Sequence, residues 1–263
     1  MASINIVRNI AYGADPRHRL DLYRPARLAR GAVLVIHGGG WWTGDKAGVS
    51  ALAGTLASAG YLAVAPNYRL ATAHKNNYPT QVEDVAAALG WLRSSDLPYN
   101  RALIAAVGSS SGGNLAIELG LRYGVPSVSW SGLLNLDGFV ADHPGLEPKR
   151  LEIDPNGPPS TIDQTGANDA YYLWCIQNLM GGKMSLIRQA TPIHRVTPHA
   201  GPMFLAGSLR EFVPAKEIAL MVAAAIAAGV GVECMVLPGS AHGDAYMADA
   251  IRPTMVFLDR YLG

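Results

Sequence analysis

Short apolar runs alternate along the chain with longer stretches in which apolar residues recur at helical spacing. Short continuous apolar runs are typical of strands buried on both faces, and the longer stretches are typical of helices that cover those faces. We therefore predict an α/β fold with a mostly parallel sheet and helices on both sides. The predicted strands are residues 18–23 (an early edge strand), 32–36, 61–65, 102–107, 125–130, 202–206 and 230–237.

Helix patterns fill the spaces between these strands. In residues 78–92, Val82, Val85 and Leu89 recur at helical spacing, and Pro79 is tolerated in a first turn because its missing N–H has no helical partner there. Gly60 and Gly124 mark the ends of two helices. The predicted helices are residues 47–59, 78–92, 115–121, 214–228 and 245–261.

The regular alternation stops between residues 137 and 198, where Pro, Gly and Asn are frequent and only residues 171–180 have a helical pattern. A long irregular stretch inside a compact domain is uncommon and is often a cover over an active site. We expect a single domain over residues 1–263, with an inserted lid at about 137–198.

Composition and charge narrow the function classes. The chain has 263 residues, 49% of them apolar, and its 21 Lys and Arg balance 20 Asp and Glu. Without a dense basic run, nothing in the charge pattern indicates a nucleic acid or an anionic membrane, so a small molecule is the expected partner. Cys175 and Cys234 are too few for a disulfide framework, and Cys and His are not at metal-ligand spacing, so we expect no metal or other cofactor.

The N-terminal residues lack the layout of a signal peptide, and the most apolar helical stretch, residues 218–232, is shorter than the roughly 20 residues of a membrane span. We therefore expect a cytoplasmic protein without a membrane span. The sequence is compatible with a homodimer.

Three glycine-containing segments carry the candidate chemistry, each directly after a predicted strand. In Gly108-Ser109-Ser110-Ser111-Gly112, the G-x-S-x-G spacing is typical of a sharp strand-to-helix turn that exposes its central serine, here Ser110. A Ser- and Gly-rich turn or a phosphate-binding loop is the alternative, but no Walker lysine follows.

The segment His37-Gly38-Gly39-Gly40 precedes this motif by about 70 residues and also follows a buried strand. Successive glycines leave backbone N–H groups free to point at a developing oxyanion, and the expected donors are the amides of Gly39, Gly40 and Ser111. A tight structural turn is the alternative for this loop alone.

His242 lies in the last of these segments, between the final predicted strand and the final helix, where a general base for Ser110 is expected. The chain order serine, acid, histidine places the acid after residues 202–206, where Glu211 is the one carboxylate. Asp137 and Asp244 are alternative acids, and Glu211 can instead be a surface residue paired with Arg210 or Lys216.

With these residues together, the chain resembles the α/β-hydrolase superfamily, and within it the hormone-sensitive-lipase-like carboxylesterases and the arylformamidase (kynurenine formamidase) relatives. The resemblance implies the α/β-hydrolase fold and the roles assigned above to Ser110, His242, Glu211 and the amides. Such esterases often have Asp or His where this chain has Ser109, and more often have Asp one position before Glu211. The resemblance also rests on five further segments of this chain: Leu20 to Pro25, Trp41 to Lys46, Gly60-Tyr61, Asn67 to Leu70 and Tyr78 to Asp84.

The leading hypothesis is therefore a serine hydrolase that cleaves a small carboxylic ester, or an aryl amide or formamide, through an acyl-enzyme. An acyltransferase or tailoring enzyme would use the same residues, and a non-catalytic binding protein would keep the fold alone. The aromatic residues of 171–180 can line an apolar acyl pocket, but the same spacing also fits a helix packed on the core.

Overall fold

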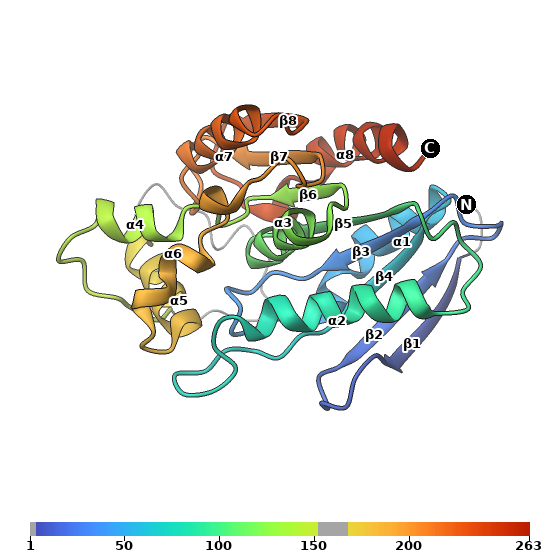
Figure 1. Ribbon diagram of the computed structural model, residues 1–263, viewed down its shortest axis with the longest axis horizontal. Helices are drawn as coiled ribbons and strands as arrows, with labels where there is room; N and C mark the ends of the chain where they lie inside the picture. The colour runs from blue at the N-terminus through green and yellow to red at the C-terminus, as the bar shows by residue number, and fades with distance from the viewer. Residues whose placement is uncertain (1–3, 152–167) are drawn as a thin grey trace.

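The computed structural model describes residues 4–151 and 168–263, whose strands form one eight-stranded sheet in the order β1-β2-β4-β3-β5-β6-β7-β8 (Figure 1). The pairs β1–β2 and β2–β4 are antiparallel, and the remaining pairs are parallel. The strands are β1 (Asn5–Ala11), β2 (Arg19–Arg24), β3 (Ala32–Ile36), β4 (Leu62–Pro66), β5 (Ile104–Ser109), β6 (Ser127–Trp130), β7 (Met203–Ser208) and β8 (Val232–Leu237).

The predicted parallel sheet is confirmed, and its strands β3 to β7 are buried along their whole length. The prediction that residues 18–23 form an edge strand is wrong, because β1 pairs with β2 on its outer side. The sequence of β1 contains Arg and Asn, and most of its residues are exposed, so this strand lacks the apolar run that revealed the others.

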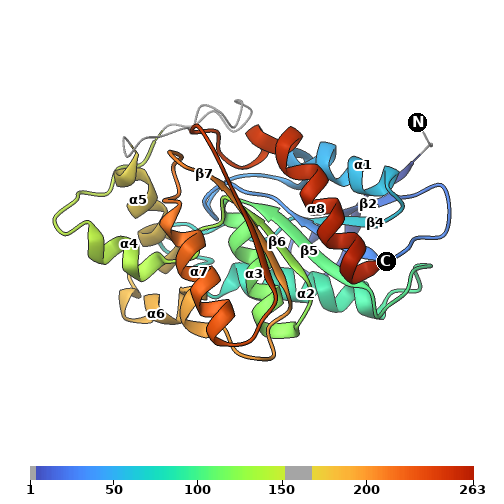
Figure 2. The same cartoon turned by 90° about the horizontal axis from the view of Figure 1, so that it is seen from above.

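Helices cover both faces of the sheet, as the sequence predicts (Figure 2). One face packs against α1 (Ser50–Ser58) and α8 (Met247–Leu262), which share an apolar core with Val33, Val35 and Val107 of the sheet. The other face packs against α2 (Thr80–Ser94), α3 (Ser111–Tyr123) and α7 (Lys216–Ala227). Residues 47–59, predicted as one helix, begin with a short 3₁₀ turn, η1 (Lys46–Val49), before α1.

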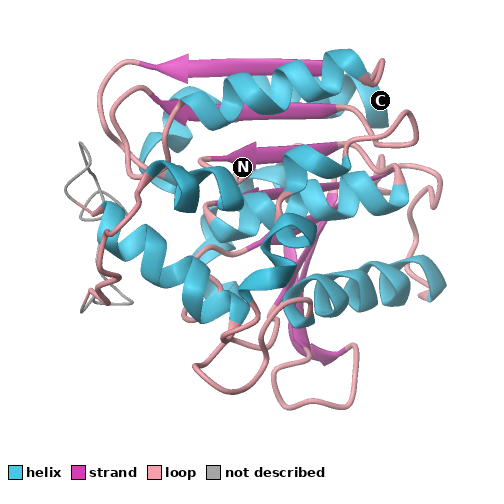
Figure 3. Cartoon of the chain, turned by 60° about the vertical axis from the view of Figure 1, so that its left-hand side comes forward, coloured by secondary structure: helices cyan, strands magenta, loops and turns pink. Residues whose placement is uncertain are grey.

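The predicted lid contains more helix than its sequence pattern indicates. Besides α5 (Asp169–Met180), the described residues form α4 (Leu136–Asp142), η3 (Met184–Leu186), α6 (Ile187–Ala190) and η4 (Pro192–Arg195). These additional elements span seven residues or fewer, too short to display a helical period. Figure 1 shows α4, α5 and α6 gathered at the end of the sheet toward which β3 points, and Figure 3 shows helices packed beside the strands of the sheet. Residues 152–167 of the predicted lid lie outside the described residues.

No helix of the described residues is long and apolar enough to span a membrane, which agrees with the prediction from the sequence.

Candidate active site

Ser110 lies at a sharp turn between β5 and α3, with φ of 54° and ψ of −128°. A non-glycine residue with positive φ is uncommon and marks a backbone that its surroundings hold in place. A side chain on Gly108 would collide with the carbonyl of Gly112, and one on Gly112 would collide with the carbonyl of Ile36. The glycines therefore allow the close approach of strand and helix that the turn requires.

The burial of the three neighbouring serines distinguishes them. Ser109 and Ser111 are buried, whereas Ser110 is partly exposed. The Ser109 hydroxyl is engaged within the protein, where it donates to Asp244 Oδ2 at 3.2 Å. Of the three, Ser110 is therefore the serine that a substrate can reach. The helix begins at Ser111, four residues before its predicted start. Gly112 and Gly113 give this first turn no helical sequence pattern, but they allow it to pack closely against neighbouring backbone.

The glycine loop after β3 lies directly beside Ser110. A Cβ atom placed on Gly38 would be 3.2 Å from Ser110 Cβ. Gly39 and Gly40 have φ of 114° and 56°, and a Cβ on Gly40 would be 2.8 Å from the Cys175 thiol of α5. The loop therefore needs glycine for its backbone conformation and for its contact with α5.

His37 contacts the backbone of this loop and a neighbouring aromatic ring, and so stabilises the loop. Its ring stacks on Tyr68 with 4.2 Å between centroids, and its Nδ1 lies 2.7 Å from Gly38 O, to which it donates. Burial lowers the pKa of His37 to about 4, so the ring is neutral near pH 7.

His242 is buried between β8 and η5 (Gly243–Tyr246), and its loop packs on the serine turn. A Cβ on Gly243 would be 3.3 Å from Ser109 Cβ. The Nδ1 atom of His242 lies 2.5 Å from Glu211 Oε2, and its Nε2 atom has no hydrogen-bond partner among the described residues. Nε2 is thus free to accept a proton.

Glu211 follows β7 and is only 6% exposed, so the alternative of a surface glutamate is wrong. Its second oxygen, Oε1, accepts from the Ser208 amide at 2.7 Å and from the Ser131 hydroxyl at 2.9 Å. Lys216, a proposed surface partner, instead pairs with Asp142. The structure therefore brings together the predicted acid and the predicted base.

The two alternative acids have other partners. Asp137, on α4, lies 2.8 Å from Nε2 of His194, and Asp244 accepts from Ser109. Burial raises the pKa of Asp244. Neither carboxylate is hydrogen-bonded to His242 in the part of the chain that the structure describes.

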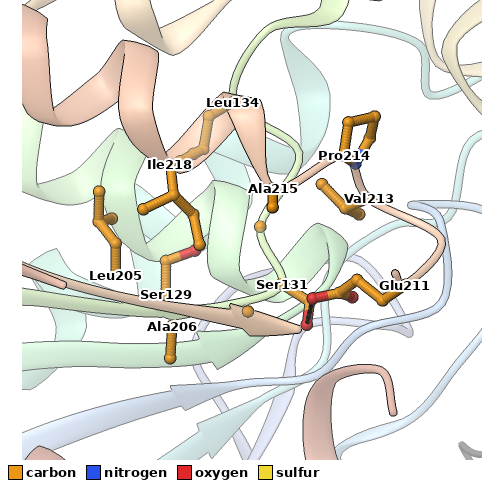
Figure 4. A pocket seen from close by; sticks show the side chains of 12 residues that line it. Ser129, Ser131, Leu134, Leu205, Ala206, Glu211, Val213, Pro214, Ala215 and Ile218 are labelled. Carbon is orange, nitrogen blue, oxygen red and sulfur yellow. Dashed lines mark hydrogen bonds between the residues drawn. The ribbon is translucent and has the colours of Figure 1, made fainter. Parts of the chain in front are cut away.

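Sequence reasoning missed two residues that contact this arrangement, Ser131 and Tyr246. Ser131 follows β6 directly, and its hydroxyl reaches the Glu211 carboxylate (Figure 4). The sequence signal that could have identified Ser131 is its position directly after the strand between β5 and β7, where active-site residues of parallel sheets are found. A cavity of about 10 Å³, lined by Ser129, Ser131, Leu205 and Ile218 among others, adjoins Glu211.

Most residues of α5 pack in the core, which fits the expectation of a helix packed on the core better than that of an acyl pocket. Tyr172, Leu173 and Met180 are buried. Trp174 is partly exposed and meets Trp42 edge to face at 5.2 Å between ring centroids. The structure therefore brings Trp42, which follows the glycine loop, against α5.

Within residues 4–151 and 168–263, no group of three or more His, Cys, Asp or Glu side chains is arranged to hold a metal ion.

Known proteins resemble this chain in sequence and in fold. The chain is 28% identical to esterase LipC of Mycobacterium tuberculosis over 248 residues, which cover 90% of this chain and 59% of that protein. It therefore spans about three fifths of the length of this curated relative.

Solved structures share the fold over nearly the whole chain. An esterase from the bacterial hormone-sensitive lipase family has a TM-score of 0.76 at 22% identity, covering 99% of this chain and 85% of the other. A truncated carbohydrate esterase from gut microbiota also has a TM-score of 0.76, at 19% identity, covering 99% and 97%. The α/β-hydrolase fold expected from the sequence is thereby confirmed.

The family model named BD-FAE matches residues 20–223, which include the glycine loop, Ser110 and Glu211. This match covers most of the chain. The chain belongs to the BD-FAE family of α/β-hydrolase-fold proteins.

Proposed function

We propose that this protein is a serine esterase that hydrolyses small carboxylic esters through an acyl-enzyme, with Ser110 as nucleophile, His242 as base and Glu211 as acid. One observation carries the proposal: His242 Nδ1 is 2.5 Å from the buried Glu211 carboxylate, while its Nε2 has no hydrogen-bond partner in the part of the chain that the structure describes. A carboxylate at Nδ1 holds the proton there and leaves Nε2 as the acceptor for the serine proton. The partly exposed Ser110 lies at the adjoining turn.

In the proposed reaction, His242 Nε2 takes the proton of Ser110 while Oγ attacks the ester carbonyl. The resulting oxyanion accepts hydrogen bonds from the amides of Gly39, Gly40 and Ser111. The imidazolium, stabilised by Glu211, then protonates the leaving alcohol. Water deprotonated by His242 attacks the acyl-enzyme and releases the acid and free Ser110.

The substrate class rests on the relatives. The name of the M. tuberculosis relative, an esterase, supports an ester over an aryl formamide. The indoles of Trp42 and Trp174 next to the glycine loop are partly exposed, and the Arg150 guanidinium lies over both rings, 4.5 Å and 5.6 Å from their centroids. This surface therefore offers a substrate both aromatic and cationic contacts.

The test is a comparison of initial rates on 4-nitrophenyl acetate, butyrate and octanoate and on N-formylkynurenine. We expect turnover of at least one ester, little deformylation, and loss of ester turnover in Ser110→Ala. Absence of turnover on all esters, or faster turnover of N-formylkynurenine, would contradict the proposal.

A second assay separates hydrolysis from acyl transfer. The same ester is supplied with methanol as a competing acceptor, and the products are separated. We expect free acid as the main product at low methanol concentration. Dominance of the methyl ester under those conditions would show an acyltransferase instead.

A further inference from the structure

Ser131 joins two structural parts that meet next to His242. Its hydroxyl oxygen lies 2.9 Å from Glu211 Oε1, 2.9 Å from the Gly243 amide and 2.7 Å from the Tyr246 hydroxyl. Glu211 belongs to the loop after β7, and Gly243 and Tyr246 are the first and last residues of η5, which directly follows His242. Ser131 is 2% exposed, so these contacts are shielded from bulk solvent.

The direction of each hydrogen bond follows from counting protons. An ionised carboxylate only accepts, so the single hydroxyl proton of Ser131 is donated to Glu211. The Gly243 amide can only donate, and it donates to Ser131 Oγ. Tyr246 must then donate its own proton to Ser131, with Ala206 O at 3.1 Å as the more distant alternative acceptor.

The Tyr246 hydroxyl is well suited to remain a donor. Burial, followed by the nearby Glu211 carboxylate, raises the pKa of Tyr246 well above its ordinary value. The tyrosine therefore stays protonated near neutral pH and remains a donor.

The backbone at Ser131 is held in an unusual conformation. Its φ is 51°, and its amide donates to Ala206 O at 2.7 Å. Positive φ at a non-glycine residue persists only where the surroundings hold it. With the backbone in this conformation, the Ser131 hydroxyl lies between Glu211 and Gly243.

We propose that Ser131 is a positioning residue for the catalytic acid: with Tyr246 as its donor, it fixes the Glu211 carboxylate on His242 and ties the loop of the acid to the loop of the base. A glutamate has one more rotatable bond than an aspartate, so its carboxylate needs more anchoring to present one oxygen to Nδ1. Ser131 and the Ser208 amide hold Oε1 while Oε2 faces His242. This inference rests on the proposed function of Glu211.

The test is a double-mutant cycle with ester turnover as the readout. Ser131→Ala removes the hydroxyl and is expected to lower kcat about 10- to 100-fold, the scale of a buried hydrogen bond to a charged group, with KM changed less than about threefold. Tyr246→Phe should lower kcat in the same direction by a smaller factor. In the Glu211→Gln background, Ser131→Ala should have little further effect, because its role passes through Glu211.

Ser129→Ala is the matched control. Ser129 is buried two residues earlier on β6, lines the same cavity, and its hydroxyl has no hydrogen-bond partner among the described residues. We expect its kcat to stay within about threefold of wild type. Circular dichroism and thermal unfolding establish that each variant is folded, and Tyr246→Phe carries the test if Ser131→Ala does not fold.

Two outcomes would overturn the inference. One is a kcat of Ser131→Ala, or of Tyr246→Phe in its place, equal to that of Ser129→Ala. The other is an equal fall on adding the substitution to wild type and to Glu211→Gln, which indicates a general structural role. A near-normal Glu211→Gln enzyme would instead refute the proposed acid, so the two failures are distinguishable.

Discussion

Glu211 Oε2 lies 2.5 Å from Nδ1 of His242, although the two residues are 31 positions apart in the sequence. They follow the neighbouring parallel strands β7 and β8, whose last residues, Ser208 and Leu237, are in register. Because parallel neighbours end at the same edge of a sheet, the loops that follow them meet. The sheet topology thus places the carboxylate on the histidine.

This contact predicts the effect of Glu211→Gln. The substitution keeps the size of the side chain but removes the charge that stabilises the imidazolium. The equivalent aspartate-to-asparagine change in a serine protease lowers turnover about 10⁴-fold, and we expect a fall of at least about 100-fold here. Steady-state kinetics on a 4-nitrophenyl ester measure it. Asp137→Asn is the control, because Asp137 pairs with His194, and the reverse pattern would move the acid to α4.

The burial of the serine turn predicts that one of its serines is indispensable. Ser110→Ala should abolish ester turnover without unfolding, because it removes the nucleophile. Ser109→Ala should keep measurable turnover, because its hydroxyl is directed at Asp244. Rates and far-ultraviolet circular dichroism of both variants check this. A dead Ser109→Ala with an active Ser110→Ala would refute the assignment.

The glycine loop should not tolerate a side chain at residue 40. Gly40→Ala forces a Cβ atom to 2.8 Å from the Cys175 thiol at a positive φ, so we expect kcat to fall about 100-fold, the scale of a lost oxyanion donor. Cys175→Ala opens that space, and the double variant should recover part of the rate. The kcat values of the three variants measure this. A Gly40→Ala enzyme with wild-type kcat would show that the loop tolerates a side chain at residue 40 and would contradict this prediction.

Glu217 predicts a pH dependence of stability. Its buried carboxylate accepts from the Leu134 and Asn135 amides and from the Tyr172 hydroxyl of α5. Burial raises the pKa of Glu217 from 4.5 to about 7 despite these hydrogen bonds. Because the folded state binds this proton more tightly than the unfolded state, the contribution is complete below pH 4.5 and is lost as the pH rises to about 7.

Glu217→Gln should remove this dependence, since the amide stays neutral at every pH. Urea unfolding at several pH values between 4.5 and 8 gives the free energy of unfolding of both proteins. We expect wild type to lose stability relative to Glu217→Gln as the pH rises. A difference between the two proteins that does not vary with pH would contradict the prediction.

The sequence predicts the parallel sheet well because buried strands such as β3 and β5 are continuous apolar runs. It does not predict β1, whose polar, exposed residues resemble a loop. It also places the start of α3 too late, since Gly112 and Gly113 look unfavourable for a helix until the neighbouring strand backbone is known. Packing against distant segments, which no local pattern displays, decides both cases.

For the site, glycine spacing and chain order single out Ser110, His242 and Glu211. The roles of Ser131 and Tyr246 cannot be read in the same way. Their roles follow from contacts that form only in the folded chain. The Ser131 hydroxyl contacts Glu211, which is 80 positions away in the sequence, and the Tyr246 hydroxyl contacts Ser131. The sequence likewise does not reveal that Asp137 is engaged with His194.

The measurement that tests the central claim most directly is labelling with a fluorophosphonate probe, with the modified residue located by mass spectrometry. An activated serine with a base at its side reacts with such a probe, whereas an ordinary serine does not. We expect one label per chain, on Ser110, with slower labelling of Glu211→Gln and none of Ser110→Ala. A folded wild-type protein that remains unlabelled, or that is labelled on another serine, would contradict the assignment of Ser110, His242 and Glu211 as a catalytic triad.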